Sequence, residues 1–134
     1  MRREAEKIAL DLEIDSAGTA DWHVGRPPDS RAVAAARRAG IDISRMRARQ
    51  VTRADFHRFD HIVALDLSNL AALEAIRPVG ARARLALLLD HVSARAGQGV
   101  ADPYYGEVAQ FDATWNEVAT AARGLARKIA DGAL

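Results

Sequence analysis

Phe59-Asp60-His61-Ile62-Val63-Ala64-Leu65-Asp66 is the stretch of sequence that decides the fold. Its centre, residues 61–65, is an apolar run of strand length. A helical pattern follows over residues 67–77 and ends at Pro78, which cannot continue a helix. Residues 84–89 are the most continuous apolar run of the chain and predict a buried strand. Strand, helix and strand in this order predict a parallel sheet with helices on both faces.

The rest of the chain extends this α/β pattern. A short strand is expected at residues 12–14, which brings the number of expected strands to three. An amphipathic helix is expected first, with Ala5, Ile8, Ala9 and Leu12 at helical spacing. The other expected helices cover residues 31–39, 52–58 and 107–130. We therefore expect one domain over residues 1–134, an open parallel sheet flanked by helices.

Several of these helices carry local start and stop signals. Asp29 or Ser30 can cap the helix at residues 31–39, and Gly40 is placed to end it. Thr52 and Asp55 are spaced as a capping box for the short helix that follows. The long C-terminal helix has one apolar stripe, which should face the core: Phe111, Trp115, Val118, Ala122, Leu125 and Ile129.

Composition excludes several classes of function. With 19 basic and 18 acidic residues the net charge is +1, so we expect no nucleic-acid partner and no membrane partner. No apolar run is long enough to span a bilayer and no signal peptide is visible, which makes a cytoplasmic location the default. The chain has no cysteine, which excludes disulfides and thiol chemistry within these 134 residues.

The stretch Ala101-Asp102-Pro103-Tyr104-Tyr105-Gly106 carries the strongest chemical signal. Proline disfavours the helical region for the residue before it and fixes its own φ, so Asp102 should be held extended. Two phenol rings next to this carboxyl can flank an aromatic substrate and lower the local polarity. Partial desolvation raises the pKa of a carboxyl, which suits a general acid. An ordinary Asp-Pro turn with two core tyrosines is the alternative.

Five motifs in order resemble the low-molecular-weight protein tyrosine phosphatases over nearly the whole chain. They are Ile14-Asp15-Ser16-Ala17-Gly18-Thr19-Ala20-Asp21-Trp22-His23-Val24-Gly25, Ala48-Arg49-Gln50, the stretch 59–66, Ser68-Asn69-Leu70 and the stretch 101–106. The resemblance implies the phosphotyrosine phosphatase I-like fold, a four-stranded parallel sheet with the family's first strand in its middle. That central first strand is the one we expect to be absent from this chain.

The resemblance also implies a hydrolysis of phosphotyrosine in two steps, through a phosphocysteine intermediate. Asp102 then acts as the general acid for the leaving phenolate, and later as the base that activates water. Trp22, Tyr104 and Tyr105 are expected to contact the aromatic ring of the substrate. Ser16 and Asp66 match positions that brace the phosphate-binding loop, although a serine at a strand end is equally a local turn-former. Met46 stands where many relatives place a supporting histidine.

One departure from the family outweighs these agreements. The family's signature is a cysteine, five residues and an arginine after the first strand, and this chain has no cysteine. Because the helix at Met1 begins without a capping residue, we expect an N-terminally incomplete phosphatase domain, inactive as given. The alternatives are a pseudophosphatase that binds phosphotyrosine or protein, a structural subunit, and an arsenate-reductase relative, whose chemistry also needs cysteines.

Cofactors and partners follow from the same reasoning. His57 and His61 are four residues apart, but the strand entry between them breaks the helix that a metal pair needs, so we expect no metal and no cofactor. The expected partner is a phosphotyrosine protein or a small aryl phosphate. A missing central strand leaves unpaired strand edges, from which we expect either rearrangement of the strands or self-association.

Overall fold

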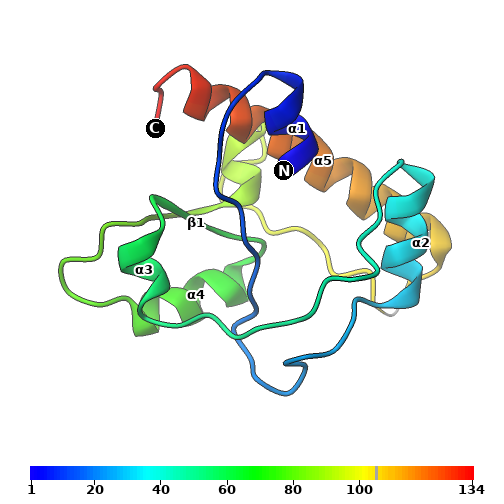
Figure 1. The fold of residues 1–134 in the computed structure, drawn as a ribbon, viewed down its shortest axis with the longest axis horizontal. Helices are drawn as coiled ribbons and strands as arrows, with labels where there is room; N and C mark the ends of the chain where they lie inside the picture. Colours follow the sequence, from blue (N-terminus) through cyan, green and yellow to red (C-terminus); the bar gives the residue numbers. More distant parts are fainter. Residues whose placement is uncertain (105) are drawn as a thin grey trace.

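The molecule contains two parallel strands with helices on both sides, and α2 lies at the opposite end from them (Figure 1). The computed structural model describes residues 1–104 and 106–134. The α-helices are α1 (Arg2–Lys7), α2 (Ser30–Arg38), α3 (Asp55–Arg58), α4 (Leu67–Ile76) and α5 (Val108–Ala130), with a 3₁₀ helix, η1 (Leu88–His91). The strands are β1 (His61–Ala64) and β2 (Arg84–Leu87).

The predicted strand–helix–strand unit is confirmed. β1 and β2 pair in parallel, with His61 opposite Arg84 and Ala64 opposite Leu87. The connection between them contains α4, as a parallel crossover requires. The chain is therefore an α/β protein with a parallel sheet flanked by helices.

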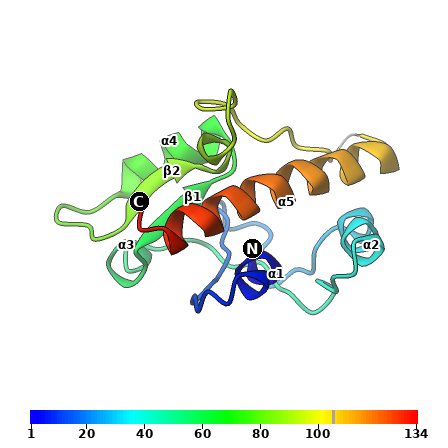
Figure 2. The ribbon, with the colours of Figure 1, turned by 90° about the horizontal axis from the view of Figure 1, so that it is seen from above.

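The two faces of the sheet pack against different helices, because successive strand residues point to opposite sides. Ile62 and Ala64 belong to a core cluster with Phe56 of α3 and Leu73 of α4. Val63 instead packs on the cluster formed by η1 and α5, which includes Leu89, Ala121 and Leu125. Figure 2 shows α4 and α5 on the two sides of the strands.

Helices α1 and α2 lie against α5, away from the strands (Figure 2). An ion pair fixes each of them to α5. Arg38 of α2 contacts Asp112 at 2.7 Å, and Glu4 of α1 accepts from Arg123 at 3.3 Å. Glu4 is only 5% exposed. Burial raises the pKa of this carboxyl, but Arg123 and Lys7 outweigh it and hold the pKa below its usual range.

Two predictions at the N-terminus are wrong. The helix expected over residues 1–12 ends at Lys7, because the chain turns away through Ala9 with φ +52° and Leu10 N–H bonds back to Ala5 O at 2.9 Å. The strand expected at residues 12–14 is absent from the described part of the chain. An extended segment becomes a strand only where a partner lies beside it, and here the first partner is met later, at an isolated parallel bridge between Gly18 and Gln50.

The other predicted elements are confirmed to within a few residues. Asp29 caps α2 by accepting from Arg31 N–H at 2.8 Å, and Asp55 accepts from Thr52 N–H at 2.8 Å ahead of α3. The apolar run at residues 84–89 is divided, because the chain leaves the sheet after Leu87 and enters η1. Among the helices described, none is both long and apolar enough to cross a membrane.

Helix α5 packs closely on η1 at Gly124, in the middle of α5. A Cβ at this position would lie 2.5 Å from His91 O of η1. That distance is below any normal contact and involves backbone, which cannot swing aside. Glycine is therefore needed here for the approach of α5 to η1, although it weakens the helix itself.

We expect Gly124→Ala to lower the free energy of unfolding by about 1–3 kcal/mol, because overpacking outweighs the gain in helix propensity. Urea denaturation followed by circular dichroism measures the change. Ala113→Gly, at an exposed position of α5, is the control for propensity alone and should cost about 1 kcal/mol. An alanine at position 124 that leaves stability unchanged or raised would contradict this packing.

Candidate active site

Asp66 and the loop that leads to Asp102 lie near the carboxyl ends of the parallel strands, where open α/β sheets place their sites. Asp66 follows β1 by two residues and caps α4, its Oδ1 accepting from Asn69 N–H at 2.7 Å. The loop after η1 returns to the same place, because Val100 N–H donates to Leu65 O at 2.7 Å. A Cβ on Gly99 would lie 3.0 Å from Asp66 Cα, so this loop passes directly over Asp66.

The N-terminal segment reaches the same edge of the sheet. Thr19 Oγ1 donates to Asn69 Oδ1 at 3.2 Å, which ties the segment to the first turn of α4. Ser16 lies three residues earlier, is exposed, and donates its backbone N–H to Asp15 Oδ1 at 2.8 Å. The structure thus brings Thr19, three residues after Ser16, to the helix that Asp66 caps, while the bracing roles of Ser16 and Asp66 stay predictions.

Arg49 braces this N-terminal segment from behind. Its guanidinium donates to Asp15 at 3.1 Å and to both oxygens of Asp55, at 3.0 and 3.2 Å. Asp55 is 8% exposed and also accepts from Thr52 N–H. Burial raises the pKa of the Asp55 carboxyl, but Arg49 and the Thr52 amide outweigh it and hold the pKa below its usual range. The sequence motif 48–50 therefore contains a structural cation.

The Asp102 loop is held by its own backbone. Asp102 Oδ1 accepts from Tyr104 N–H at 3.0 Å, and Gly106 N–H donates to Pro103 O at 2.8 Å. Asp102 itself is exposed, so the desolvation expected from the neighbouring phenol rings is not seen in the described residues. Tyr104 is 56% exposed, which rules out the alternative of a core tyrosine at this position. Tyr105 lies outside the described residues.

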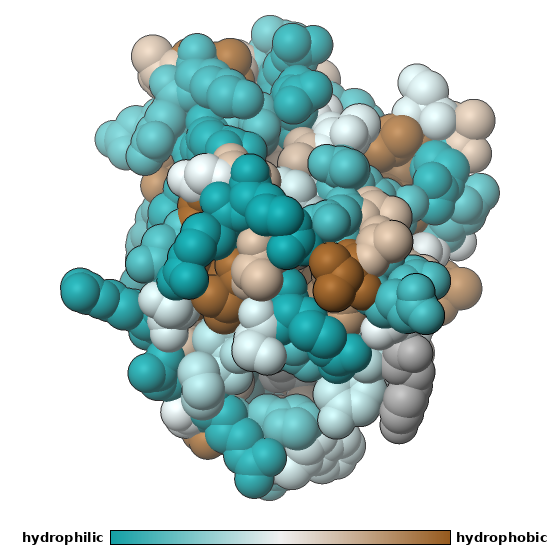
Figure 3. All heavy atoms as spheres, turned by 90° about the vertical axis from the view of Figure 1, so that its right-hand side faces the viewer, coloured by the Kyte–Doolittle hydropathy of each residue, from teal (hydrophilic) through white to brown (hydrophobic). Residues whose placement is uncertain are grey.

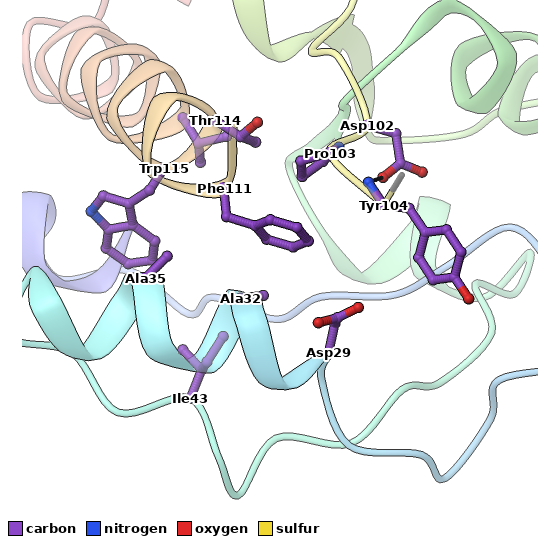
Figure 4. A pocket seen from close by; sticks show the side chains of 11 residues that line it. Asp29, Ala32, Ala35, Ile43, Asp102, Pro103, Tyr104, Phe111, Thr114 and Trp115 are labelled. Carbon is purple, nitrogen blue, oxygen red and sulfur yellow. Dashed lines mark hydrogen bonds between the residues drawn. The ribbon is translucent and has the colours of Figure 1, made fainter. Parts of the chain in front are cut away.

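A cavity of about 320 Å³ opens beside this loop, between α2 and α5. Figure 4 shows Asp102, Tyr104 and Asp29 at one end, and Phe111 and Trp115 further in. Apart from these the lining is mainly small or apolar: Ala32, Ala35, Ile43, Pro103, Thr114 and Val118. The sequence indicated Asp29 only as a cap and Phe111 and Trp115 only as core. No local signal places them at Asp102, since Asp29 begins α2 and the two aromatic residues belong to α5.

Trp22 does not line this cavity. It lies in the turn over residues 21–25 and is 70% exposed, with its ring edge-on to His23 at 6.2 Å between centroids. Trp22 is thus no core residue, and its expected contact with substrate stays a prediction. Met46 is 38% exposed. Across the described residues, no three His, Asp or Glu side chains gather closely enough to hold a metal ion.

Figure 3 shows the face of the molecule at the right-hand side of Figure 1, which carries α2 and the start of α5. Hydrophilic side chains cover most of this face, and hydrophobic ones emerge between them in small separate groups. No broad apolar surface is visible in this view.

Comparison with known proteins decides the family. The family model "Low molecular weight phosphotyrosine protein phosphatase" matches residues 1–133. The chain belongs to this family. The fission yeast (Schizosaccharomyces pombe) member is 40% identical over 108 residues, which cover 78% of this chain and 69% of that protein. The pig (Sus scrofa) member is 36% identical over 126 residues, or 92% of this chain and 78% of that one.

Solved structures agree with the sequence comparison. A protein tyrosine phosphatase from Entamoeba histolytica superposes with a TM-score of 0.92 at 27% identity, over 99% of this chain and 86% of that one. A Vibrio cholerae low-molecular-weight phosphatase superposes with a TM-score of 0.88 at 28% identity. The resemblance drawn from the five motifs is therefore confirmed, and the family indicates phosphotyrosine phosphatase chemistry.

We expect Asp55→Asn to lower the free energy of unfolding by about 1–3 kcal/mol, because a half-buried cation loses its charged acceptor. Since the pKa of Asp55 is lowered by folding, its carboxylate contributes stability above its ordinary pKa. That contribution is lost as the pH falls through the ordinary pKa towards the lower folded value. Urea denaturation at neutral pH and at about pH 3 should show a difference between variant and wild type that shrinks in acid.

The matched control is Asp60→Asn. Asp60 pairs with Arg82, but the two side chains are 67% and 62% exposed. A surface ion pair of this kind contributes about 0–1 kcal/mol. Equal losses at positions 55 and 60 would contradict the bracing role of Arg49 and Asp55.

Proposed function

We propose that this chain carries the proton-donating half of a phosphotyrosine phosphatase site, with Asp102 as the general acid. The supporting observation is the hydrogen bonding of the two oxygens of its carboxyl group. Oδ1 accepts from Tyr104 N–H, whereas Oδ2 takes no hydrogen bond from the described residues. One oxygen is thus fixed by the loop, and the other is available at an exposed edge to carry a proton to substrate.

The proposed chemistry begins with attack of a thiolate on phosphorus. As the P–S bond forms, the bond from phosphorus to the phenolic oxygen breaks, and Asp102 gives its proton to that oxygen. Asp102 then takes a proton from water, which attacks phosphorus and releases the thiolate. The chain has no cysteine, so the thiolate cannot come from these 134 residues.

Other residues are proposed to recognise the substrate. Trp22 and Tyr104 are exposed aromatic side chains suited to contact a phenyl ring, and Tyr105 follows directly in sequence. Ser16 and Asp66 are proposed to brace a phosphate-binding loop from the edge of the sheet. The proposed substrate is a phosphotyrosine protein or a small aryl phosphate, and the cytoplasmic location expected from the sequence stays a prediction.

We expect the 134-residue chain alone to hydrolyse p-nitrophenyl phosphate no faster than a blank. General-acid help supplies roughly 10²–10⁴, a small part of the acceleration that phosphate monoesters need, up to roughly 10²¹. Ser16 is no substitute, because its hydroxyl would need a dedicated base and a cradle of amides to become nucleophilic. Steady-state release of nitrophenolate without added metal is the measurement. Turnover traced to this chain would overturn the assignment.

The role of Asp102 is tested by adding a nucleophilic cysteine to the chain. The strand and the cysteine-x₅-arginine loop that the family resemblance implies, joined ahead of Met1, should restore hydrolysis. Asp102→Asn should then lower turnover of phenyl phosphate by roughly 10²–10⁴ and that of p-nitrophenyl phosphate far less, since nitrophenolate departs without a proton. Asp112→Asn, on α5 and paired with Arg38, is the control. Equal effects on the two substrates would argue against Asp102 as the acid.

A phosphotyrosine-binding module without catalysis is the second candidate. Two observations favour it, the absence of cysteine and the exposed aromatic side chains of Trp22 and Tyr104. Isothermal titration with a phosphotyrosine peptide and with its unphosphorylated form discriminates the two functions. A binding module should prefer the phosphorylated peptide and lose that preference in Trp22→Ala. An acid half-site alone should bind neither form measurably.

We also propose self-association through the free edge of β1. Arg84 N–H bonds to Asp60 O, so alternation along a parallel pair directs the backbone of His61 and Val63 towards the other edge. No backbone hydrogen bond from outside the strand pair reaches these two residues within the described chain. Free strand edges pair with other chains. Sedimentation velocity should therefore show a coefficient that rises with concentration, and a monomer at every concentration would contradict this.

A further inference from the structure

Arg31, near the start of α2, contacts both the cap of its own helix and a distant loop. Its guanidinium donates to both oxygens of Asp29, through Nε at 3.1 Å and Nη2 at 2.9 Å. Asp29 is itself the cap of α2 and accepts from Arg31 N–H. The planar guanidinium is therefore locked against the first turn of the helix in a two-point pair.

The same guanidinium reaches across to the Asp102 loop. Nη2 donates to Tyr104 O at 2.8 Å, and Nη1 donates to Gly106 O at 3.2 Å. The guanidinium carbon of Arg31, Cζ, lies 4.5 Å from the ring centroid of Phe111 on α5 and 5.7 Å from that of Tyr104. Arg31 thus joins α2, the loop and α5 at a single point.

The loop transmits this contact to the carboxyl group of Asp102. Tyr104 is held by Arg31 at its carbonyl and holds Asp102 Oδ1 with its N–H. The turn that contains Tyr104 is closed by a hydrogen bond from Gly106 N–H to Pro103 O. Resting on the proposed role of Asp102 as general acid, we propose that Arg31 is the positioning residue that sets the orientation of the Asp102 carboxyl group through Tyr104.

Only arginine can make this set of contacts. Four hydrogen bonds in one plane and a stack on an aromatic ring require the guanidinium fork, which the compact ammonium of lysine lacks. The positive charge of Arg31 is also stabilised by its pairing with Asp29. Hydrogen bonds from Arg31 lower the pKa of Asp29, and Asp29 raises the pKa of Arg31, so both groups stay ionised through the neutral range.

The experiment is a pH titration of the 134-residue chain followed by amide NMR. The Tyr104 amide proton should shift as Asp102 gains its proton, and Asp102→Asn should abolish that shift. In Arg31→Gln the amplitude should fall to less than about half, because a hydrogen bond weakens steeply once its geometry is lost. Exchange of the Gly106 amide with solvent should become roughly tenfold faster.

The control is Arg38→Gln, which removes another α2 arginine. Arg38 pairs with Asp112 of α5, and it makes no hydrogen bond to the loop among the described residues. This variant should leave both signals unchanged, which separates positioning from general loss of helix packing. Arg31→Lys keeps the charge without the fork and should recover less than half of the amplitude. If Arg31→Gln fails to fold, Arg31→Lys and Asp29→Asn carry the test.

Two results would overturn the proposal. One is a Tyr104 amide that follows Asp102 with full amplitude in the Arg31 variants. The other is a Tyr104 shift that survives Asp102→Asn, which would mean that the bond between them is absent in solution. Neither depends on catalysis. Failure of the leaving-group experiment would remove the acid role of Asp102 and leave the positioning result standing.

Discussion

The parallel pairing of β1 with β2 is the interaction on which the rest of the structure depends. Because side chains alternate between the two faces of the sheet, Ile62 and Ala64 pack in one core cluster and Val63 packs on the other. Two parallel strands also end at the same edge, so the chain leaving β1 and the chain returning from η1 meet there. The bond from Val100 N–H to Leu65 O marks that meeting. Without this pairing, Asp66 and the loop that leads to Asp102 would not be held at the same edge of the sheet.

The elements that could be predicted are those whose sequence pattern and final environment agree. His61 to Ala64 is apolar, short and followed by a capped helix, and it becomes a strand. The apolar stripe of α5 is long enough to outweigh local variation, and Phe111, Ala122 and Leu125 from it are buried. The residues at 12–14 have a strand-like pattern too, but a strand is defined by its partner, which the local sequence cannot supply.

The candidate site was predictable only as a list of residues. Asp102, Tyr104 and Asp66 could be found because each lies in a recognisable motif. Arg31 and Phe111 lie in ordinary helical patterns, and their meeting at the Asp102 loop results from the packing of α2 on α5. The expected desolvation of Asp102 failed for the same reason, since the exposure of a carboxyl group depends on distant segments and not on its neighbours in sequence.

The proposed acid loop and the nucleophile of a phosphatase need different supports. A thiolate at neutral pH requires a ring of amides at a helix N-terminus, close to the end of a strand. The Asp102 loop instead takes its support from α2 and α5, through Arg31, Asp29 and Phe111. None of these contacts involves the strands. The geometry of the proposed proton donor can therefore form in a chain without a cysteine, because none of its supports lies at the strand end that a thiolate would need.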